Sequence, residues 1–158
     1  MKFNSQQPKD FIKTLQIIHW ALVLGVLVFT AVIAYTQKNT LYFSYTENKM
    51  FLYMAIIISF IGNMASKQLY AKLISQINVN QKLFDKAAKY STAHILRVAM
   101  LEFPALMCVI FAMQSNNSFY FILVAILVII MIAIFPSKEK FINDVPLTPK
   151  EKSMLEKL

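Results

Sequence analysis

Four long apolar stretches separated by polar segments dominate the pattern of this chain. They cover residues 17–35, 50–64, 98–113 and 118–135. Each stretch is continuous, whereas the strands of a membrane β-barrel alternate between apolar and polar positions. A helix needs about 20 apolar residues to cross a hydrocarbon core about 30 Å thick. The pattern therefore predicts an all-α membrane protein built as a bundle of four transmembrane helices.

The expected domain organisation follows from these stretches. Residues 1–136 form the four-helix transmembrane domain, with spans at about 15–36, 49–66, 94–114 and 118–135. Residues 67–93 continue the helical spacing of apolar positions, so we expect a helical hairpin that projects into the cytoplasm. The short polar link before residue 118 makes the last two spans antiparallel neighbours. Residues 137–158 form a cytoplasmic tail with a short helix.

Basic residues are distributed unevenly between the two sides of the predicted bundle. The chain has 16 Lys and Arg residues and a net charge of +8, yet only Lys38 and Lys49 lie in the loop between the first two spans. The other basic residues lie in the two tails and between the second and third spans, with Arg97 at the mouth of the third span. The positive-inside rule then puts both termini in the cytoplasm. Because this rule accounts for the charge, we expect the lipid bilayer as a partner and no nucleic acid.

A few polar residues interrupt the apolar stretches. His19, Asn63 and Glu102 lie in three different spans, all in the half of the membrane nearer the cytoplasm. Ionisable groups inside a membrane are costly unless they are paired. We therefore expect these three residues to form an intramembrane polar cluster. Arg97 is expected to anchor the third span at the lipid interface, and Pro104 is expected to kink that span and free a backbone carbonyl.

No arrangement of residues in the sequence indicates catalysis. We find no nucleophile–base pair and no metal-ligand spacing, so we expect no catalytic residue, no metal and no cofactor. The single cysteine, Cys108, lies inside the third span and is interpreted as a packing residue. His19 and His94 lie on two helices at comparable depths, as two axial haem ligands would. Haem binding by these histidines stays open as an alternative.

A motif near the C-terminus predicts the closing helix. In residues 148–151 (Thr-Pro-Lys-Glu), the threonine and the glutamate have the spacing of a capping box, and proline occupies the first helical position. The helix that follows is short and amphipathic, with Met154, Leu155 and Leu158 on one side. Such a helix is too short to be stable alone, so we expect it to lie on the membrane surface or against a partner.

Two segments of the chain resemble a known sequence pattern. The run from Arg97 to Leu106 (R-x4-E-x-P-A-L) and the exit from the last span at residues 136–144 resemble small uncharacterised bacterial inner-membrane proteins with four spans. The resemblance covers the chain from about residue 94 to the C-terminus. It implies the four-helix architecture and a multi-pass location in the bacterial inner (cytoplasmic) membrane. It implies no activity.

Three functions remain open from the sequence. The leading hypothesis is a non-enzymatic integral membrane protein, an accessory or interaction subunit or a small oligomeric scaffold, present as a homo-oligomer or in a larger membrane complex. The second is a small transporter or proton-coupled channel that uses Glu102 and His19. The third is a haem-binding redox subunit that uses His19 and His94. The outer halves of the spans offer almost no polar path, which disfavours transport.

Overall fold

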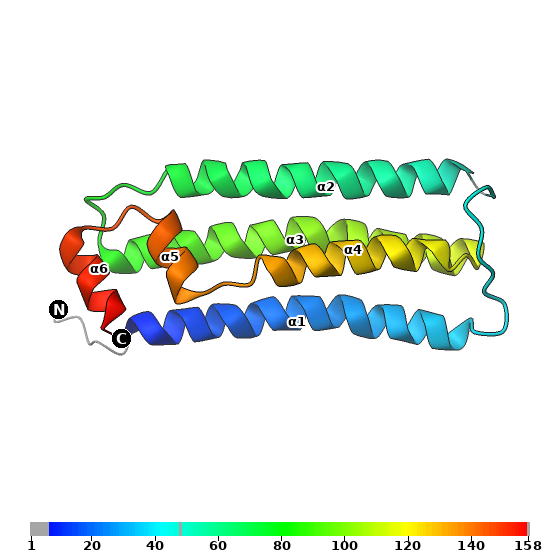
Figure 1. The fold of residues 1–158 in the computed structure, drawn as a ribbon, viewed down its shortest axis with the longest axis horizontal. Helices are drawn as coiled ribbons and strands as arrows, with labels where there is room; N and C mark the ends of the chain where they lie inside the picture. Colours follow the sequence, from blue (N-terminus) through cyan, green and yellow to red (C-terminus); the bar gives the residue numbers. More distant parts are fainter. Residues whose placement is uncertain (1–6, 48, 158) are drawn as a thin grey trace.

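A computed structural model of the chain describes residues 7–47 and 49–157, with side chains from Asp10 onward. Six helices make up this part of the chain (Figure 1): α1 (Gln7–Thr36), α2 (Lys49–Ser75), α3 (Leu83–Ser115), α4 (Phe119–Ala133), α5 (Lys138–Asp144) and α6 (Pro149–Glu156). No strand occurs over the described ranges. They contain an isolated β-bridge between Tyr42 and Asn117. The prediction of an all-α protein is confirmed.

Several of these helices have the length and composition of membrane spans. α1, α2 and α3 are each long and apolar enough to cross a membrane, and α4 with α5 makes a fourth if this pair, bent by 78°, is one span. The chain thus has three to four candidate spans, as a multi-pass membrane protein does. α4 alone has 15 residues, about 22 Å of helix, which is shorter than the hydrocarbon core.

α3 is the central helix of the bundle. α1, α2 and α4 all pack against it, and α1 and α2 run along opposite sides of it (Figure 1). Along α3, fully buried residues recur every three or four positions, at Val98, Leu101, Ala105, Cys108 and Ala112. This spacing places them on one face of a helix, where they form the main core with α1 and α4. Cys108 is buried within this row.

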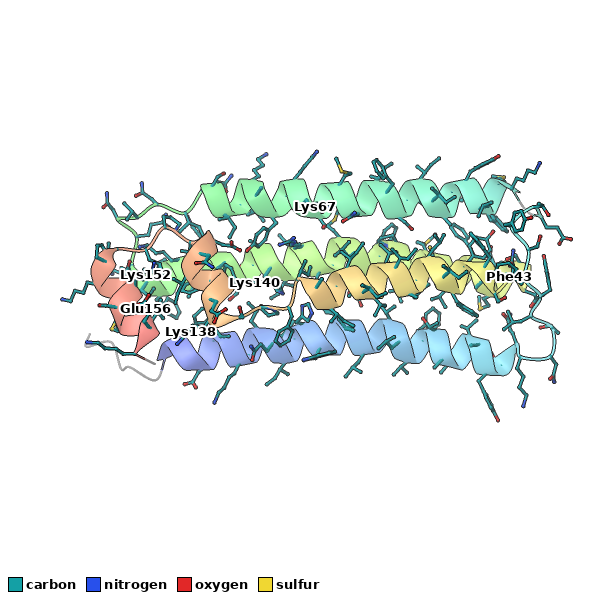
Figure 2. All side chains as sticks on the ribbon, in the orientation of Figure 1. Phe43, Lys67, Lys138, Lys140, Lys152 and Glu156 are labelled. Carbon is teal, nitrogen blue, oxygen red and sulfur yellow. The ribbon has the colours of Figure 1, made fainter. Side chains whose placement is uncertain are left out.

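The two ends of the bundle differ. We call the end that carries α5 and α6 the terminal end, since both ends of the described chain lie there, and the other the loop end (Figure 1). Lys138, Lys140, Lys152 and Glu156 gather at the terminal end, whereas Phe43 lies at the loop end (Figure 2).

At the loop end, the segment after α1 closes over the link between α3 and α4. The Tyr42 N–H donates to the Asn116 carbonyl (2.9 Å), and the Ser118 N–H donates to the Tyr42 carbonyl (2.8 Å). The buried Asn117 amide donates to the Ser44 carbonyl (2.6 Å). Asn116 ends α3 in the left-handed conformation (φ 52°), which asparagine tolerates better than most residues. α3 and α4 are antiparallel neighbours, as predicted.

At the terminal end, α1, α2 and α3 continue past the end of α4, and α5 and α6 pack beside them (Figure 1). A second apolar core forms there, from residues of α1 and α3 and from the tail, including Leu15, Tyr90, Phe141 and Leu155. We had expected the closing helix to lie on the membrane or against a partner, but Leu155 is only 2% exposed and packs on the protein's own helices. The short α4 leaves room for this packing. Leu158 lies outside the described residues.

Candidate functional site

Two histidines form a buried polar contact between α1 and α3. His19 and His94 are 1% and 2% exposed, and Nδ1 of His19 lies 3.1 Å from Nε2 of His94. Two neutral imidazoles satisfy this contact, because one ring donates and the other accepts. Nε2 of His19 makes no hydrogen bond within the described ranges, although the Met131 backbone lies close to this ring. Tyr90 stacks on His94, and Phe135 meets His19 edge-on.

The predicted polar cluster is not joined by hydrogen bonds in the part of the chain that the structure describes. His19 pairs with His94, the buried Oδ1 of Asn63 has no partner, and Glu102 makes no hydrogen bond or ion pair there. The physical reason is height along α3. Glu102 lies eight residues from His94, about 12 Å along the helix, so a histidine level with His94 does not reach it.

The geometry of the histidine pair bears on the haem alternative. Two axial ligands must stand on opposite sides of an iron and its porphyrin. The two imidazoles are instead in direct contact, with ring centroids 5.2 Å apart, so the residues as arranged do not fit this group. No cluster of three or more His, Cys, Asp or Glu side chains suited to a metal ion occurs among the described residues.

Glu102 lies at the seam between α3 and α1. A Cβ built on Gly25 of α1 would lie 3.9 Å from Oε1 of Glu102, so the carboxyl lies against the glycine of the neighbouring helix. Glu102 is partly exposed, Gly25 is exposed, and the adjacent Phe103 is 60% exposed. Glu102 precedes Ser115, the end of α3, by thirteen residues, or about 20 Å, which is within the thickness of a hydrocarbon core. We call Gly25, Glu102 and Phe103 the Glu102 seam.

α2 approaches α3 closely at Gly62. Pro104 lies inside α3 and lacks the N–H that would bond to the Met100 carbonyl one turn earlier. That oxygen lies 2.9 Å, and Cγ of Pro104 lies 2.8 Å, from where a Cβ on Gly62 would be. The carbonyl freed by proline therefore faces the glycine backbone, in an arrangement typical of Cα–H···O contacts between helices. The predicted free carbonyl lies against α2, away from Gly25 and α1.

Arg97 of α3 lies against α2. Its guanidinium lies 4.5 Å from the centroid of the Tyr70 ring, and its Nε is buried without a hydrogen-bond partner in the described chain. The Tyr70 hydroxyl donates to the Asp144 carboxylate (2.5 Å). These contacts connect α3, α2 and α5. A role for Arg97 as a lipid-interface anchor stays a prediction.

Lys140 closes the end of α4. Its Nζ donates to the Ala133 carbonyl (2.9 Å) and to the Phe135 carbonyl (3.0 Å). The last carbonyls of a helix have no partner inside the helix, and a lysine near the C-terminus can satisfy them. Gln16 of α1 adds a bond from Nε2 to the Pro136 carbonyl (3.0 Å). The break between α4 and α5 is therefore held by polar contacts.

The closing helix is connected to α3 by a buried ion pair. Nζ of Lys86, which is fully buried, lies 2.7 Å from Oε2 of Glu151. The same carboxylate accepts from the Thr148 N–H (2.8 Å), so the predicted capping box is present. Burial raises the pKa of Glu151, but hydrogen bonds from Lys86 and Thr148 outweigh burial and leave the pKa below its ordinary value.

Several of these residues were missed by sequence reasoning, although the sequence carried signals for them. Lys86 was not singled out among the basic residues, yet it lies between Leu83 and Tyr90 at the spacing of a buried helix face. Gly25 and Gly62 are the only two glycines of the chain. Each lies inside an apolar stretch, where glycine disfavours a helix by about 1 kcal/mol relative to alanine, so a packing reason was to be expected.

Comparisons with known proteins identify no relative of this chain. No protein-family model, no curated protein and no solved structure matches this chain. The resemblance to small four-span inner-membrane proteins stays a prediction.

Proposed function

We propose that this protein is a non-enzymatic, membrane-embedded interaction subunit whose Glu102 seam binds a transmembrane helix of a different membrane protein. The observation that carries the proposal is Glu102 itself, a carboxyl group on an apolar surface with no hydrogen bond or ion pair to the described residues. An acidic side chain in the middle of a membrane helix costs about 2.5–3.5 kcal/mol on insertion scales. A partner helix that carries Lys, Arg or His at this level supplies the missing charge.

Gly25 supports this proposal from the side of α1. Small residues are enriched where transmembrane helices meet, because they let two backbones approach closely. Gly25 is exposed beside the carboxyl, so a partner helix can come close to α1 and still reach Glu102. The exposed Phe103 ring provides apolar area next to the charge. Together they offer a close backbone contact, a charge and an apolar surface.

The charge pattern of the chain favours a different protein over a second copy as the occupant. The four apolar stretches at residues 17–35, 50–64, 98–113 and 118–135 contain no Lys or Arg. The nearest basic residue along α3 is Arg97, five residues from Glu102, and it already stacks on Tyr70. A parallel pair of copies meeting at this seam would bring two carboxyls together, and like charges repel. In this proposal the terminal end faces the cytoplasm of a bacterial inner membrane, as the distribution of basic residues favours.

A photocrosslinking experiment in the native membrane tests the proposal. A photoreactive phenylalanine replaces Phe103, and in a matched control it replaces Phe60 of α2, whose side chain is 66% exposed. We expect position 103 to give one dominant protein adduct, and the crosslinked helix to carry a basic residue at the level of Glu102. The control position should give mainly lipid adducts. Adducts to lipid alone at position 103, or to a second copy of this chain, would contradict the proposal.

A further inference from the structure

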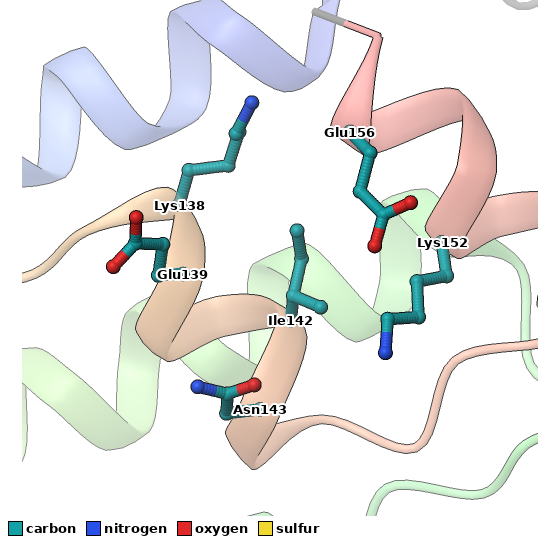
Figure 3. A pocket seen from close by; sticks show the side chains of 6 residues that line it. All are labelled: Lys138, Glu139, Ile142, Asn143, Lys152 and Glu156. Carbon is teal, nitrogen blue, oxygen red and sulfur yellow. The ribbon is translucent and has the colours of Figure 1, made fainter.

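A polar cavity lies between α5 and α6 at the terminal end. It has a volume of about 350 Å³, within the range of small-ligand sites. Six residues line it: Lys138, Glu139, Ile142, Asn143, Lys152 and Glu156. In Figure 3, Lys152 and Glu156 extend from α6 toward Ile142 of α5, which lies between the two helices.

The charged side chains around this cavity are unpaired. The side chains of Lys138, Glu139, Lys152 and Glu156 make no hydrogen bond or ion pair with any described residue. The cavity thus offers charges of both signs from Lys152 and Glu156, which extend toward Ile142, whereas the Glu139 carboxylate points away from α6 (Figure 3). A simple anion there would meet a carboxylate, and a simple cation would meet an ammonium group. A ligand that carries one charge of each sign matches the lining.

The position of α5 indicates where such a ligand comes from. α5 makes an angle of 78° with α4, so it runs nearly across the bundle. If α4 crosses the membrane, α5 lies roughly parallel to the membrane plane, and it begins only five residues after Ala133, the last residue of α4. This is the depth of lipid headgroups, which form a layer several ångström thick outside the hydrocarbon core.

We propose that the cavity binds a phosphoethanolamine group. The phosphate lies toward Lys152, and the ammonium group lies toward Glu156. Phosphatidylethanolamine carries this group in the membrane, and free phosphoethanolamine carries it in solution. The site is independent of the Glu102 seam, because it lies on α5 and α6 at the end of the bundle.

Lipid binding to the full chain in detergent tests this proposal. Native mass spectrometry of the purified protein compares phosphatidylethanolamine with phosphatidylglycerol, whose headgroup lacks the ammonium group. We expect the wild-type chain to retain phosphatidylethanolamine about tenfold better, as one charge-assisted hydrogen bond allows. Lys152→Gln should weaken the binding of both lipids, whereas Glu156→Gln should remove the preference between them. Lys150→Gln is the matched control, since Lys150 is exposed on α6 and does not line the cavity.

A parallel titration with soluble phosphoethanolamine, followed by phosphorus NMR, distinguishes the two sources. Binding of both ligands shows that the headgroup suffices, binding of the lipid alone assigns the site to the membrane, and binding of the soluble compound alone assigns it to the cytosol. Each of these results supports the site when Lys152→Gln weakens it. Binding of neither ligand, equal retention of the two lipids, or equal effects of Lys150→Gln and Lys152→Gln would overturn the proposal.

Discussion

Gly62 of α2 lies directly against Pro104 of α3, so closely that a Cβ at position 62 would come within 2.8 Å of the proline Cγ. The same Cβ would lie 2.9 Å from the Met100 carbonyl, which Pro104 leaves without its helical hydrogen bond. The proline thus frees a carbonyl on α3, and the glycine on the facing helix α2 leaves room for that carbonyl. The pair fixes how near α2 lies to the central helix.

Replacement of Gly62 is therefore expected to destabilise the bundle. Gly62→Ala gains about 1 kcal/mol in helix propensity, but overpacking a tight core costs about 1–3 kcal/mol. We expect a lower unfolding temperature for this variant in detergent. Gly25→Ala is the matched control, because its Cβ meets only the Glu102 oxygen at 3.9 Å, an ordinary contact. Equal or higher stability of Gly62→Ala relative to Gly25→Ala would contradict this packing.

The Lys86–Glu151 pair should control the docking of α6. Removing one partner of a buried ion pair costs up to about 3–5 kcal/mol, because the other charge stays buried alone. Lys86 is fully buried, whereas Glu151 keeps 16% of its side chain exposed. Glu151→Gln leaves the fully buried lysine unpaired, so it should be more destabilising than a substitution that removes the Lys86 charge. Hydrogen exchange of the amides in residues 149–156 measures the effect. Lys89→Met, which changes an exposed lysine of α3, should leave this exchange unaltered. Unchanged protection in Glu151→Gln would count against the docking role.

The same ion pair gives α6 a pH dependence. The folded-state pKa of Glu151 lies below its ordinary value, so its contribution is fully present above the ordinary carboxyl pKa of about 4.3. The contribution is lost as the pH falls through the lowered folded-state value. We expect the protection of α6, corrected for intrinsic exchange rates, to decrease in acid below that range. Glu151→Gln should abolish this dependence, and a wild-type profile that is flat from neutral pH to acid would disagree with it.

The histidine pair should behave as a coupled unit. His19→Leu or His94→Leu leaves the other imidazole buried without its partner, which costs about 1–3 kcal/mol. The double variant loses both polar groups together, so it should be less destabilised than the sum of the two single variants. A double-mutant cycle on thermal unfolding should give a coupling of about 0.6–1.7 kcal/mol, which are the average and the maximum measured for hydrogen bonds between membrane helices. Strict additivity would mean that the contact contributes nothing.

Local sequence patterns predicted the features that depend on neighbouring residues. The apolar stretches gave the long helices, residues 148–151 gave the capping box, and the polar link before residue 118 gave the antiparallel turn. The partners of individual side chains depend on rotation about each helix and on height along it. Spacing along the sequence placed His19 and His94 at comparable depths, but it also placed Glu102 in the same half of the membrane. It did not show which of these two residues His19 contacts.

The tail shows the same limit. The amphipathic pattern of the closing helix was visible, but its docking surface exists only because α4 ends at Ala133 and leaves α1 and α3 uncovered beyond it. The sequence predicted the end of this span at residue 135, before a proline, but it did not show that the chain then bends by 78°. Polar contacts from Lys140 and Gln16 hold this break. Gln16 is distant in sequence from the carbonyl that it contacts, and Lys140 is separated from the Ala133 carbonyl by the break itself.

The charge dependence of crosslinking at the Glu102 seam tests the central claim most directly. The photoreactive residue stays at position 103 while residue 102 is Glu, Gln or Lys, and the yield of the protein adduct is measured in native membranes. We predict a roughly tenfold lower yield with Glu102→Gln, as expected for the loss of one charged hydrogen bond, and none with Glu102→Lys. Replacement of the partner's basic residue by an acidic one should restore the adduct of the Glu102→Lys variant. A yield that does not depend on residue 102 would contradict the account.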